Sequence, residues 1–371
     1  MISKKKPLVF CSSCGLPYPE DKTPYLCQCG GIWDFSQFPA YFAPDLHQDY
    51  KGIWRYRTSL GLSDDAQVIT LGEGGTPLLA GKFNGISLYY KLESHNPTGS
   101  YKDRGSAVLI SFLASRGISE VVEDSSGNAG ASLAAYCARV GISARVFIPE
   151  SASGPKRWQI EQYGASVESI PGPRANAAAA VLEAASAGSI YASHAYMPFG
   201  LAGIATMAYE IFTDLGEIPE TLIAPVGHGG LLYGLMLGFE SLVASGLVDR
   251  LPHFIGVQAE ACSPAVEAFG RRMVEIPEIQ TGMTLAEGAS VVHPLRAGQI
   301  LKRMYAGAGK MISVSEQRLR EAYIRIARQG IFCEPTACLP LASLLDDKIE
   351  LAEPVVAILT GSGIKTKSIP L

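Results

Sequence analysis

The chain of 371 residues lacks the features that mark several large classes of protein. No apolar run reaches the ~20 residues needed to cross a bilayer, and the apolar stretch after the basic start is too short for a signal peptide. A net charge of −4 and a pI near 5.9 leave no basic excess for nucleic acid or an anionic membrane. Repeats and low-complexity segments are also missing. We therefore expect a cytoplasmic globular protein that binds neither nucleic acid nor a membrane.

Hydrophobic residues are plentiful at 47%, enough for a large buried core. From about residue 67, short apolar runs alternate with amphipathic stretches. The expected strands are 87–93, 120–124, 144–149, 221–227, 253–258 and 354–361, and the clearest helices between them are 104–117, 130–141 and 315–330. Strand followed by helix, repeated, predicts right-handed βαβ units and an α/β fold with mainly parallel sheets.

Four of the eight cysteines crowd near the N-terminus in a pattern typical of a metal site. Cys11 and Cys14 form a CxxC pair, and Cys27 and Cys29 follow as a CxC pair. Four thiolates on two glycine-flanked turns suit tetrahedral Zn²⁺ in a closed, structural site. A segment as short as 1–35 would need such a staple to fold. We expect a small zinc ribbon there, with a metal-free knuckle as the alternative; the other four cysteines are expected in the core.

A lysine at the start of a predicted helix is the most unusual feature of the sequence. The segment His95–Gly105 follows a predicted strand and places Lys102 in the first turn of the helix. The helix dipole disfavours a cation there. Partial burial at such a place would leave a free amine able to form a Schiff base. The alternative is a solvated lysine at an ordinary helix start.

The second loop of interest, Asp124–Gly130, also joins a strand to a helix. Small residues allow backbone amides to approach an anion, and the helix N-terminus favours negative charge. A substrate carboxylate would fit on this loop, and the Asn128 side chain could reach a phenolic oxygen of a cofactor. The alternative is an ordinary helix cap. The expected substrate-binding residues are Ser125, Ser126, Gly127, Asn128 and Ala129.

Two further loops follow predicted strands. The loop Pro225–Gly234 has successive glycine amides that make a nest for a phosphate. It matches neither a P-loop nor the GxGxxG dinucleotide pattern, and a tight βα turn is the alternative. Near the C-terminus, the hydroxyl of Thr360 could bind a ring nitrogen. The expected cofactor-binding residues are Lys102, Asn128, Val226, Gly227, His228, Gly229, Gly230 and Thr360.

Together these loops fit pyridoxal phosphate, and the sequence resembles the tryptophan synthase β-like (fold type II) pyridoxal-phosphate enzymes, most closely their threonine synthase-like members. The resemblance covers roughly residues 70–366 and is carried by 71–78, 96–105, 126–128, 330–335 and 359–365. It implies that catalytic Lys102 carries the cofactor as a Schiff base and then moves a proton. It also implies that Asn128 binds the 3-oxygen, residues 227–230 the phosphate, and neutral Thr360 the ring nitrogen.

The resemblance implies a lyase acting on a small amino acid, with threonine synthase (O-phosphohomoserine and water to threonine and phosphate) as the first reading. Such enzymes typically have an asparagine and an arginine in the stretch that matches 191–206, where this chain has no Arg, Lys or Asn. Ala202, Gly203 and Thr206, together with 284–288, resemble threonine and serine dehydratases instead. Lys156, Arg157, His194 or Arg296 could substitute for the missing cations. The alternatives are a threonine/serine ammonia-lyase, a β-replacement synthase or a non-catalytic cofactor-binding homologue.

The expected domain organisation completes the prediction. After the ribbon, 36–66 should form a linker arm without a domain of its own. Residues 67–105 and 206–371 are expected to form the larger cofactor-binding domain. Residues 106–205 are expected to form a smaller, mobile α/β domain that closes over the substrate. By analogy with the fold, we expect a homodimer.

Overall fold

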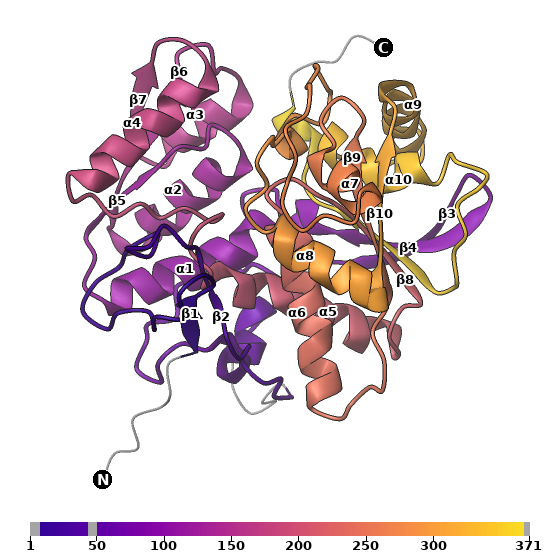
Figure 1. Ribbon diagram of the computed structural model, residues 1–371, viewed down its shortest axis with the longest axis horizontal. Coiled ribbons are helices and arrows are strands. Elements are labelled where there is room, and N and C mark those ends of the chain that lie inside the picture. The colour runs from indigo at the N-terminus through magenta and orange to yellow at the C-terminus, as the bar shows by residue number, and fades with distance from the viewer. Residues whose placement is uncertain (1–7, 44–49, 367–371) are drawn as a thin grey trace. The chain divides into compact units, whose positions relative to one another are not determined.

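The computed structural model describes residues 8–43 and 50–366, which divide into two compact units (Figure 1). One unit comprises Met1–Leu71 and Lys102–Gly203, and the other comprises Gly72–Tyr101 and Ile204–Leu371. The sequence predicted a separate ribbon and arm and placed 67–71 and 102–105 in the larger domain and 204–205 in the smaller one. The structure groups the ribbon, the described part of the arm, 67–71 and 102–105 with the first unit, and 204–205 with the second. Residues 1–7 of the predicted ribbon and 44–49 of the predicted arm lie outside the described residues.

The first unit is built on a parallel three-stranded sheet of order β5-β6-β7. Val146 and Ile148 of the central strand share a cluster with Ile160, while Phe147 between them packs with Val181. Side chains alternate between the two faces of a strand, so both faces of this sheet carry apolar residues, and helices cover both faces (Figure 1). The elements are β5 (Glu120–Glu123), α2 (Asn128–Val140), β6 (Ser143–Pro149), α3 (Pro155–Gln162), β7 (Ser166–Ile170) and α4 (Arg174–Ser186).

The N-terminal segment packs on α1 (Lys102–Ser115) in the same unit. The Tyr18 ring lies edge-on to Phe112 and to Phe199, with ring centroids 6.1 and 5.0 Å apart. Arg116, just after α1, donates hydrogen bonds to two carbonyls of the ribbon at 2.8 and 2.7 Å. The ribbon therefore shares the core of this unit. Its elements are β1 (Val9–Cys11), β2 (Trp33–Phe35) and, further on, the 3-10 helix η1 (Gly52–Leu60).

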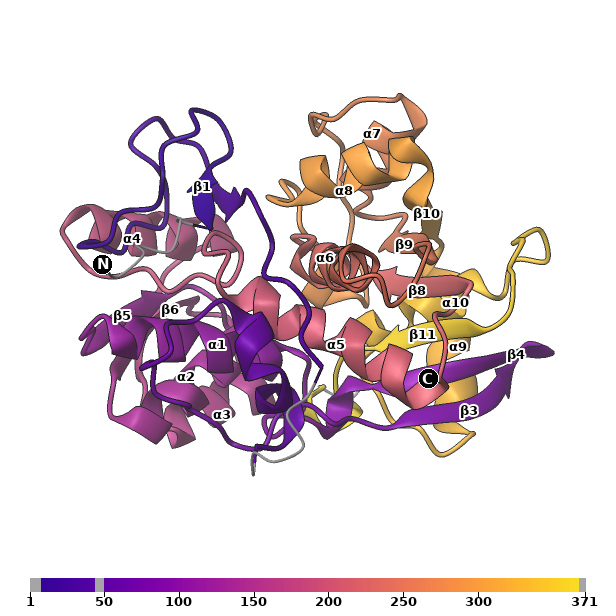
Figure 2. The ribbon, with the colours of Figure 1, turned by 90° about the horizontal axis from the view of Figure 1, so that it is seen from below.

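The second unit contains a six-stranded sheet of order β10-β9-β8-β11-β4-β3, seen as neighbouring strands in Figure 2. All pairs are parallel except β3 with β4. Ile223, Ile255 and Ala357 pack on one face with α9 and α10, while Phe239 of α6 meets Phe254 of β9 on the other face. The strands are β3 (Leu78–Phe83), β4 (Ile86–Leu92), β8 (Thr221–Pro225), β9 (His253–Ala259), β10 (Gly309–Val314) and β11 (Val355–Leu359).

Helices connect these strands, and α5 (Gly200–Leu215) runs from the first unit into the second. The others are α6 (Gly230–Ala244), α7 (Pro264–Gly270), α8 (Ala297–Arg303), α9 (Glu316–Ala327) and α10 (Leu339–Ser343). Short helical turns are η2 (Glu93–His95), η3 (Glu287–Ala289), η4 (Met304–Ala308), η5 (Pro335–Cys338) and η6 (Gly363–Lys365). Within the described ranges, no helix has the length and apolar character required to cross a membrane.

The predicted α/β class is confirmed, and each of the six predicted strands overlaps a strand of the structure, namely β4, β5, β6, β8, β9 and β11. The sequence missed β3, β7 and β10, which lie at sheet edges. In β7 no residue is fully buried, so this strand has no continuous apolar run to mark it.

Candidate active site

Lys102 is the first residue of α1 and follows directly on a segment fixed against β11 of the second unit. The backbone N–H of Tyr101 donates to the carbonyl of Thr360 at 3.0 Å, and Ser362 N–H donates to Gly99 at 2.9 Å. Thr360 itself comes immediately after β11. The backbone therefore brings the residue before Lys102 to the strand end that carries Thr360.

A buried polar network holds the start of this segment. The Asn96 amide donates to Glu93 Oε2 at 2.8 Å and accepts from Gly74 N–H at 2.9 Å. Thr76 Oγ1 donates to the other Glu93 oxygen at 2.6 Å. Since buried polar groups are costly when unpaired, these paired groups specify one path for the chain. This network joins Gly74 and Thr76 of the stretch Leu71–Leu78 to Asn96 at the start of the stretch Asn96–Gly105.

The part of this segment just before Tyr101 is held by Lys365. Its Nζ donates to the carbonyl of Thr98 at 2.6 Å, and its side chain would lie 3.0 Å from a Cβ placed on Gly99. Gly99 has a φ of +85°, in the left-handed region where other residues are strained. Glycine is therefore required at this position, two residues before Tyr101.

The predicted phosphate loop forms a tight glycine turn between β8 and α6. Val226 N–H donates to Val257 at 2.9 Å, and Arg296 N–H donates to the carbonyl of His228 at 2.9 Å. Gly229 has a φ of +92°, and a Cβ there would lie 2.8 Å from Ile300. Gly230 begins α6, whose first N–H groups have no partner within the helix. The turn is thus a backbone cradle that side chains would fill, and it suits a phosphate.

Thr360 has a neighbour that the sequence analysis did not assign a role. Its Oγ1 lies 3.4 Å from Glu334 Oε1 as a hydrogen-bond donor, and Glu334 N–H donates to Gly361 at 3.0 Å. Both side chains are buried. Glu334 lies in the stretch 330–335 that carries the family resemblance, so the sequence contained a reason to examine it. Its pairing with Thr360, however, depends on the fold.

The predicted carboxylate loop lies between β5 and α2 in the first unit. Gly127 N–H donates to Ser125 Oγ at 3.2 Å. A Cβ on Gly130 would meet the carbonyl of Ser125 at 1.9 Å, so only glycine allows this turn. Ser132 of α2 donates to Asp103 of α1 at 2.6 Å. This buried bond ties the helix that begins at Asn128 to the helix that begins at Lys102.

An acidic cluster at the end of β5 was not assigned by the sequence analysis. Glu123, the last residue of β5, is buried, and its Oε1 lies 3.6 Å from His194 Nδ1. The next residue, Asp124, accepts a hydrogen bond of 2.6 Å from the Tyr191 hydroxyl. Its other oxygen lies 3.7 Å from Arg174. The predicted anion loop therefore begins beside two carboxylates.

Burial raises the pKa of the Glu123 carboxyl well above its ordinary value, and the nearby charge of Asp124 raises it further. Lys102 and Arg174 act in the opposite direction but do not compensate. Lys102 is thus close enough to interact with Glu123 electrostatically. Burial likewise raises the pKa of Tyr191, with Glu123 and Asp124 adding to the effect.

The four N-terminal cysteines converge as the sequence predicted. Their sulfur atoms all lie within 4.8 Å of one another, with 3.4 Å between Cys11 and Cys29 and 3.7 Å between Cys14 and Cys27. Burial raises the pKa of Cys11, but hydrogen bonds from the N–H groups of Cys14 and Ser13 outweigh it and lower this pKa to about 6, whereas the pKa values of Cys27 and Cys29 are raised. The convergence of the four sulfurs, rather than their titration, therefore makes this group suited to a metal ion.

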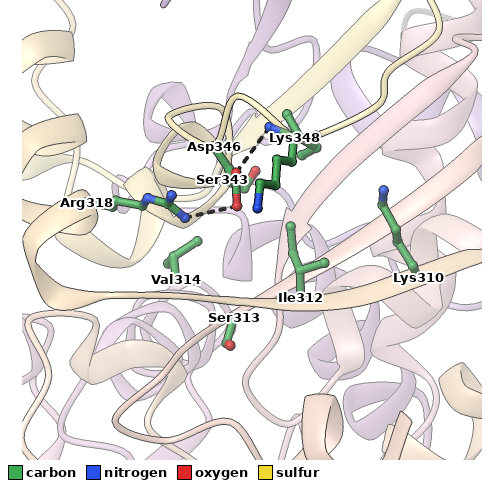
Figure 3. A pocket seen from close by; sticks show the side chains of 9 residues that line it. Lys310, Ile312, Ser313, Val314, Arg318, Ser343, Asp346 and Lys348 are labelled. Carbon is green, nitrogen blue, oxygen red and sulfur yellow. Dashed lines mark hydrogen bonds and ion pairs between the residues drawn. The ribbon is translucent and has the colours of Figure 1, made fainter. Parts of the chain in front are cut away.

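A small pocket of the second unit lies away from the residues that the sequence singled out. Its cavity volume is about 130 Å³, and it is lined beside β10 by Lys310, Arg318, Asp346 and Lys348, among others (Figure 3). Arg318 and Asp346 bind each other at 3.1 Å. Because none of the predicted site residues lines it, we assign this pocket no role in catalysis.

The described residues fit pyridoxal phosphate at the points where the chain can be tested. The turn at 227–230 is a cradle that a Cβ would obstruct, Lys102 follows the strand-end segment directly, and Thr360 offers a neutral hydroxyl. The roles of these residues toward the cofactor stay predictions. The combination of such loops with this α/β fold is typical of fold type II pyridoxal-phosphate enzymes.

Comparison with known proteins agrees with that class. The family model described as pyridoxal-phosphate dependent enzyme matches residues 69–361, and the chain belongs to this family. It is threonine synthase-like within the family: threonine synthase from Methanocaldococcus jannaschii is 35% identical over 373 residues, covering 96% of this chain and 92% of the relative. Threonine synthase from Methanosarcina acetivorans is 33% identical, with 96% and 91% covered.

Solved structures give the same fold. The T.th. threonine deaminase matches with a TM-score of 0.67 and 26% identity, covering 80% of this chain and 94% of that protein. Maize serine racemase matches with a TM-score of 0.67 at 19% identity, covering 78% and 88%, and supports the fold alone.

Proposed function

We propose that this protein is a pyridoxal-phosphate-dependent carbon–oxygen lyase that removes a leaving group from the side chain of a small amino acid. The observation that carries the proposal is the position of Lys102. The Tyr101 N–H bond to Thr360 fixes the residue before it, and α1 begins at Lys102 itself. A lysine held at a helix start on fixed backbone is suited to covalent attachment of a carbonyl cofactor.

When bound, the cofactor supplies an electron sink for negative charge at the substrate's Cα. Lys102 Nζ would hold the cofactor and then take up and return the Cα proton. The amides of Gly227–Gly230 would bind the phosphate, and Asn128 the 3-oxygen. Thr360 would offer the ring nitrogen a neutral partner. A neutral partner leaves that nitrogen less positive than an aspartate would, which favours elimination over long-lived carbanion chemistry.

Threonine synthase, which converts O-phosphohomoserine and water to threonine and phosphate, is the reaction that the relatives favour. Those compared above carry that name and match this chain over nearly its whole length. In this reaction the loop Ser125–Ala129 would hold the substrate carboxylate, and a further site would have to bind a dianionic phosphate.

A threonine or serine ammonia-lyase, or a β-replacement synthase, is the second candidate, because a specific feature favours it. The stretch 191–206 contains no Arg, Lys or Asn. Instead, His194 of this stretch lies beside the buried carboxyl of Glu123, and the charged carboxylate of Asp124 is next to Glu123. A fixed bidentate cation is the usual partner of a phosphate, and a carboxylate is not.

The two reactions leave different products. The cofactor-loaded protein should be offered O-phosphohomoserine in one assay and threonine or serine in another, measuring free phosphate and keto acid respectively. Phosphate release supports the first candidate and keto acid the second. A protein that has the visible absorbance of a bound cofactor but yields neither product would contradict both and leave the non-catalytic homologue.

We also propose that the four cysteines hold a structural Zn²⁺. Zinc–sulfur bonds of ~2.3 Å in a tetrahedron place the sulfurs roughly 3.8 Å apart, close to the 3.7 Å between Cys14 and Cys27. Four thiolates leave no open position for catalysis. Metal analysis should find one zinc per chain, and Cys14→Ser with Cys29→Ser should lose it. Cys262→Ser is the matched control, and zinc retained by the double variant would contradict the assignment.

A further inference from the structure

The strand ends of the first unit bring two segments together that are far apart in the sequence. Ala192 N–H donates to Val122 at 3.0 Å and Val122 N–H to Ile190 at 2.8 Å, so 190–192 runs parallel beside β5. Glu123 and His194 consequently lie at the carboxyl end of the same sheet. This end of a parallel sheet is where α/β proteins bind ligands, and the predicted carboxylate loop begins there.

Glu123 retains hydrogen-bonding capacity that no described residue uses. Its Oε2 is buried without a hydrogen-bond partner among the described residues, and the residue is only 1% exposed. Its Oε1, at 3.6 Å from His194 Nδ1, is beyond ordinary hydrogen-bond distance. A buried polar atom left without a partner is uncommon and calls for an explanation such as a ligand. His194 is 31% exposed, so this group of residues reaches solvent.

The charges around Glu123 exclude a phosphate more readily than a donor group. Asp124 is a carboxylate next to Glu123, and its partners Tyr191 and Arg174 are engaged with it. The other cation that interacts with Glu123 is Lys102, which the proposed function reserves for the cofactor. A dianion placed beside Glu123 would therefore meet the negative charge of Asp124 and the acceptor oxygens of a buried carboxyl, in a poorly solvated environment where such repulsion is strong.

Close packing at the start of α5, the helix that follows His194 in the chain, leaves no room for a cationic side chain that could offset the negative charge beside Glu123. A Cβ on Gly203 would lie 1.9 Å from the carbonyl of Arg104, and one on Gly200 would lie 3.1 Å from the carbonyl of Gly105. The start of α5 thus rests directly on the backbone of α1. A cationic side chain at either position would require these helices to move apart.

We propose that Glu123 and His194 form the subsite for the end of the substrate's side chain, and that this subsite takes a hydrogen-bond donor, a hydroxyl or an ammonium group, in preference to a phosphate. The inference rests on the proposed function, since it assumes that an amino acid binds at the loop Ser125–Ala129. Within that function it favours the second candidate reaction over the first. Glu123 is then a specificity-determining residue of the site.

Four amino acids that share a four-carbon chain and differ at Cγ make the test. They are 2-aminobutyrate, homoserine, 2,4-diaminobutyrate and O-phosphohomoserine, which end in a methyl, hydroxyl, ammonium and phosphate group. Each is titrated into the cofactor-loaded protein, and binding is followed by the change in the cofactor's visible absorbance. We expect homoserine or 2,4-diaminobutyrate to bind most tightly and O-phosphohomoserine most weakly. Tightest binding by O-phosphohomoserine would overturn the proposal.

Glu123→Gln distinguishes the two donors, because glutamine keeps the shape but cannot take on the negative charge that a neighbouring ammonium group would stabilise on Glu123. It should weaken an ammonium ligand roughly ten- to hundredfold, since hydrogen bonds to charged groups are worth that much. It should change homoserine, 2-aminobutyrate and O-phosphohomoserine much less. A loss specific to 2,4-diaminobutyrate identifies an ammonium site, and a smaller loss confined to homoserine identifies a hydroxyl site. Equal effects on all four ligands would assign Glu123 a purely structural role and contradict the inference.

Glu120→Gln is the matched control, since Glu120 lies on the same strand but is 54% exposed and pairs with Arg145. It should leave all four affinities unchanged. If Glu123→Gln does not fold, His194→Gln tests the same subsite from its other side. Wild-type protein that binds no cofactor would overturn the proposed function and this inference together. Cofactor-loaded protein that prefers the phosphate ligand overturns the inference alone.

Discussion

The turns after β8 and β5 occupy the same place in a strand–turn–helix unit but differ in backbone geometry and in chemistry: Gly229 before α6 is left-handed, whereas Gly127 before α2 is extended. Each leads from a parallel strand through a glycine-containing turn into a long helix, α6 or α2. After β8 the turn is Val226–Gly229, and its cradle is made by backbone alone. After β5 the turn begins with Asp124 and directly follows buried Glu123. The same helix N-terminus can therefore serve a dianionic phosphate in one place and a single carboxylate in the other, because the flanking side chains set the local charge.

Replacing Lys102 should have the largest effect, because neither turn makes a catalytic site without it. Lys102→Ala should abolish the protein's visible cofactor absorbance and lower kcat by roughly 10²–10⁴-fold or more, the contribution of a positioned base. Exposed Lys302, replaced by Ala, is the control and should change neither. Persistence of the absorbance band in Lys102→Ala would show that the lysine assignment is wrong.

Gly229→Ala tests whether the turn after β8 binds a phosphate through its backbone. Its φ of +92° is strained for alanine, and the added Cβ would lie 2.8 Å from Ile300. We expect cofactor affinity to fall at least tenfold, measured by equilibrium titration, with about 1–3 kcal/mol lost from the free energy of unfolding. Gly246→Ala has a similar φ of +74° but open space around it, so it should cost stability alone. Equal cofactor affinity in the two variants would contradict a phosphate cradle at 227–230.

Ser132→Ala tests whether side chains position the turn after β5. The buried hydroxyl donates to Asp103 at 2.6 Å, and losing it should reduce the free energy of unfolding by about 1–3 kcal/mol. Substrate affinity should weaken as α2 loses its tie to α1, whereas cofactor-phosphate binding should not. Ser186→Ala, on the exposed face of α4, should change stability by less than ~0.5 kcal/mol. Urea denaturation measures the first effect and ligand titration the second.

The smallest expected effect is on the pH dependence of stability. Glu123 has a pKa in the folded protein above that of the unfolded chain, so its contribution is fully present in acid and is lost as pH rises toward the folded pKa. The groups facing it are Asp124, Lys102, Arg174 and His194. Glu123→Gln should therefore gain stability relative to wild type as pH increases, measured as the difference in Tm. A difference that is constant with pH would show that Glu123 is charged at all these pH values.

The sequence predicted the fold well wherever burial on both faces produced an apolar run. The central strands β8 and β11 are buried at every residue, and both were predicted. In the edge strand β3 only Phe83 is fully buried, so its pattern resembles a loop. Likewise 36–66 was predicted to be a linker arm, although Trp54 and Leu60 within it are core residues of the first unit. Burial of these side chains depends on a partner surface that local sequence does not encode.

The cysteine cluster, the helix start at Lys102 and the glycine turns could be predicted from the sequence because each depends on local constraints, while the roles of these residues toward a cofactor stay predictions. Spacing brings Cys11 to Cys14, and a positive φ demands glycine at residues 99 and 229 whatever surrounds them. The pairing of Glu123 with His194 and of Thr360 with Glu334 was decided by the tertiary structure alone. Glu123 and His194 are 71 positions apart and meet because 190–192 runs parallel to β5, which places both at the carboxyl end of one sheet. Thr360 and Glu334 are 26 positions apart and meet because the backbone N–H of Glu334 finds its partner in the carbonyl of Gly361, next to Thr360.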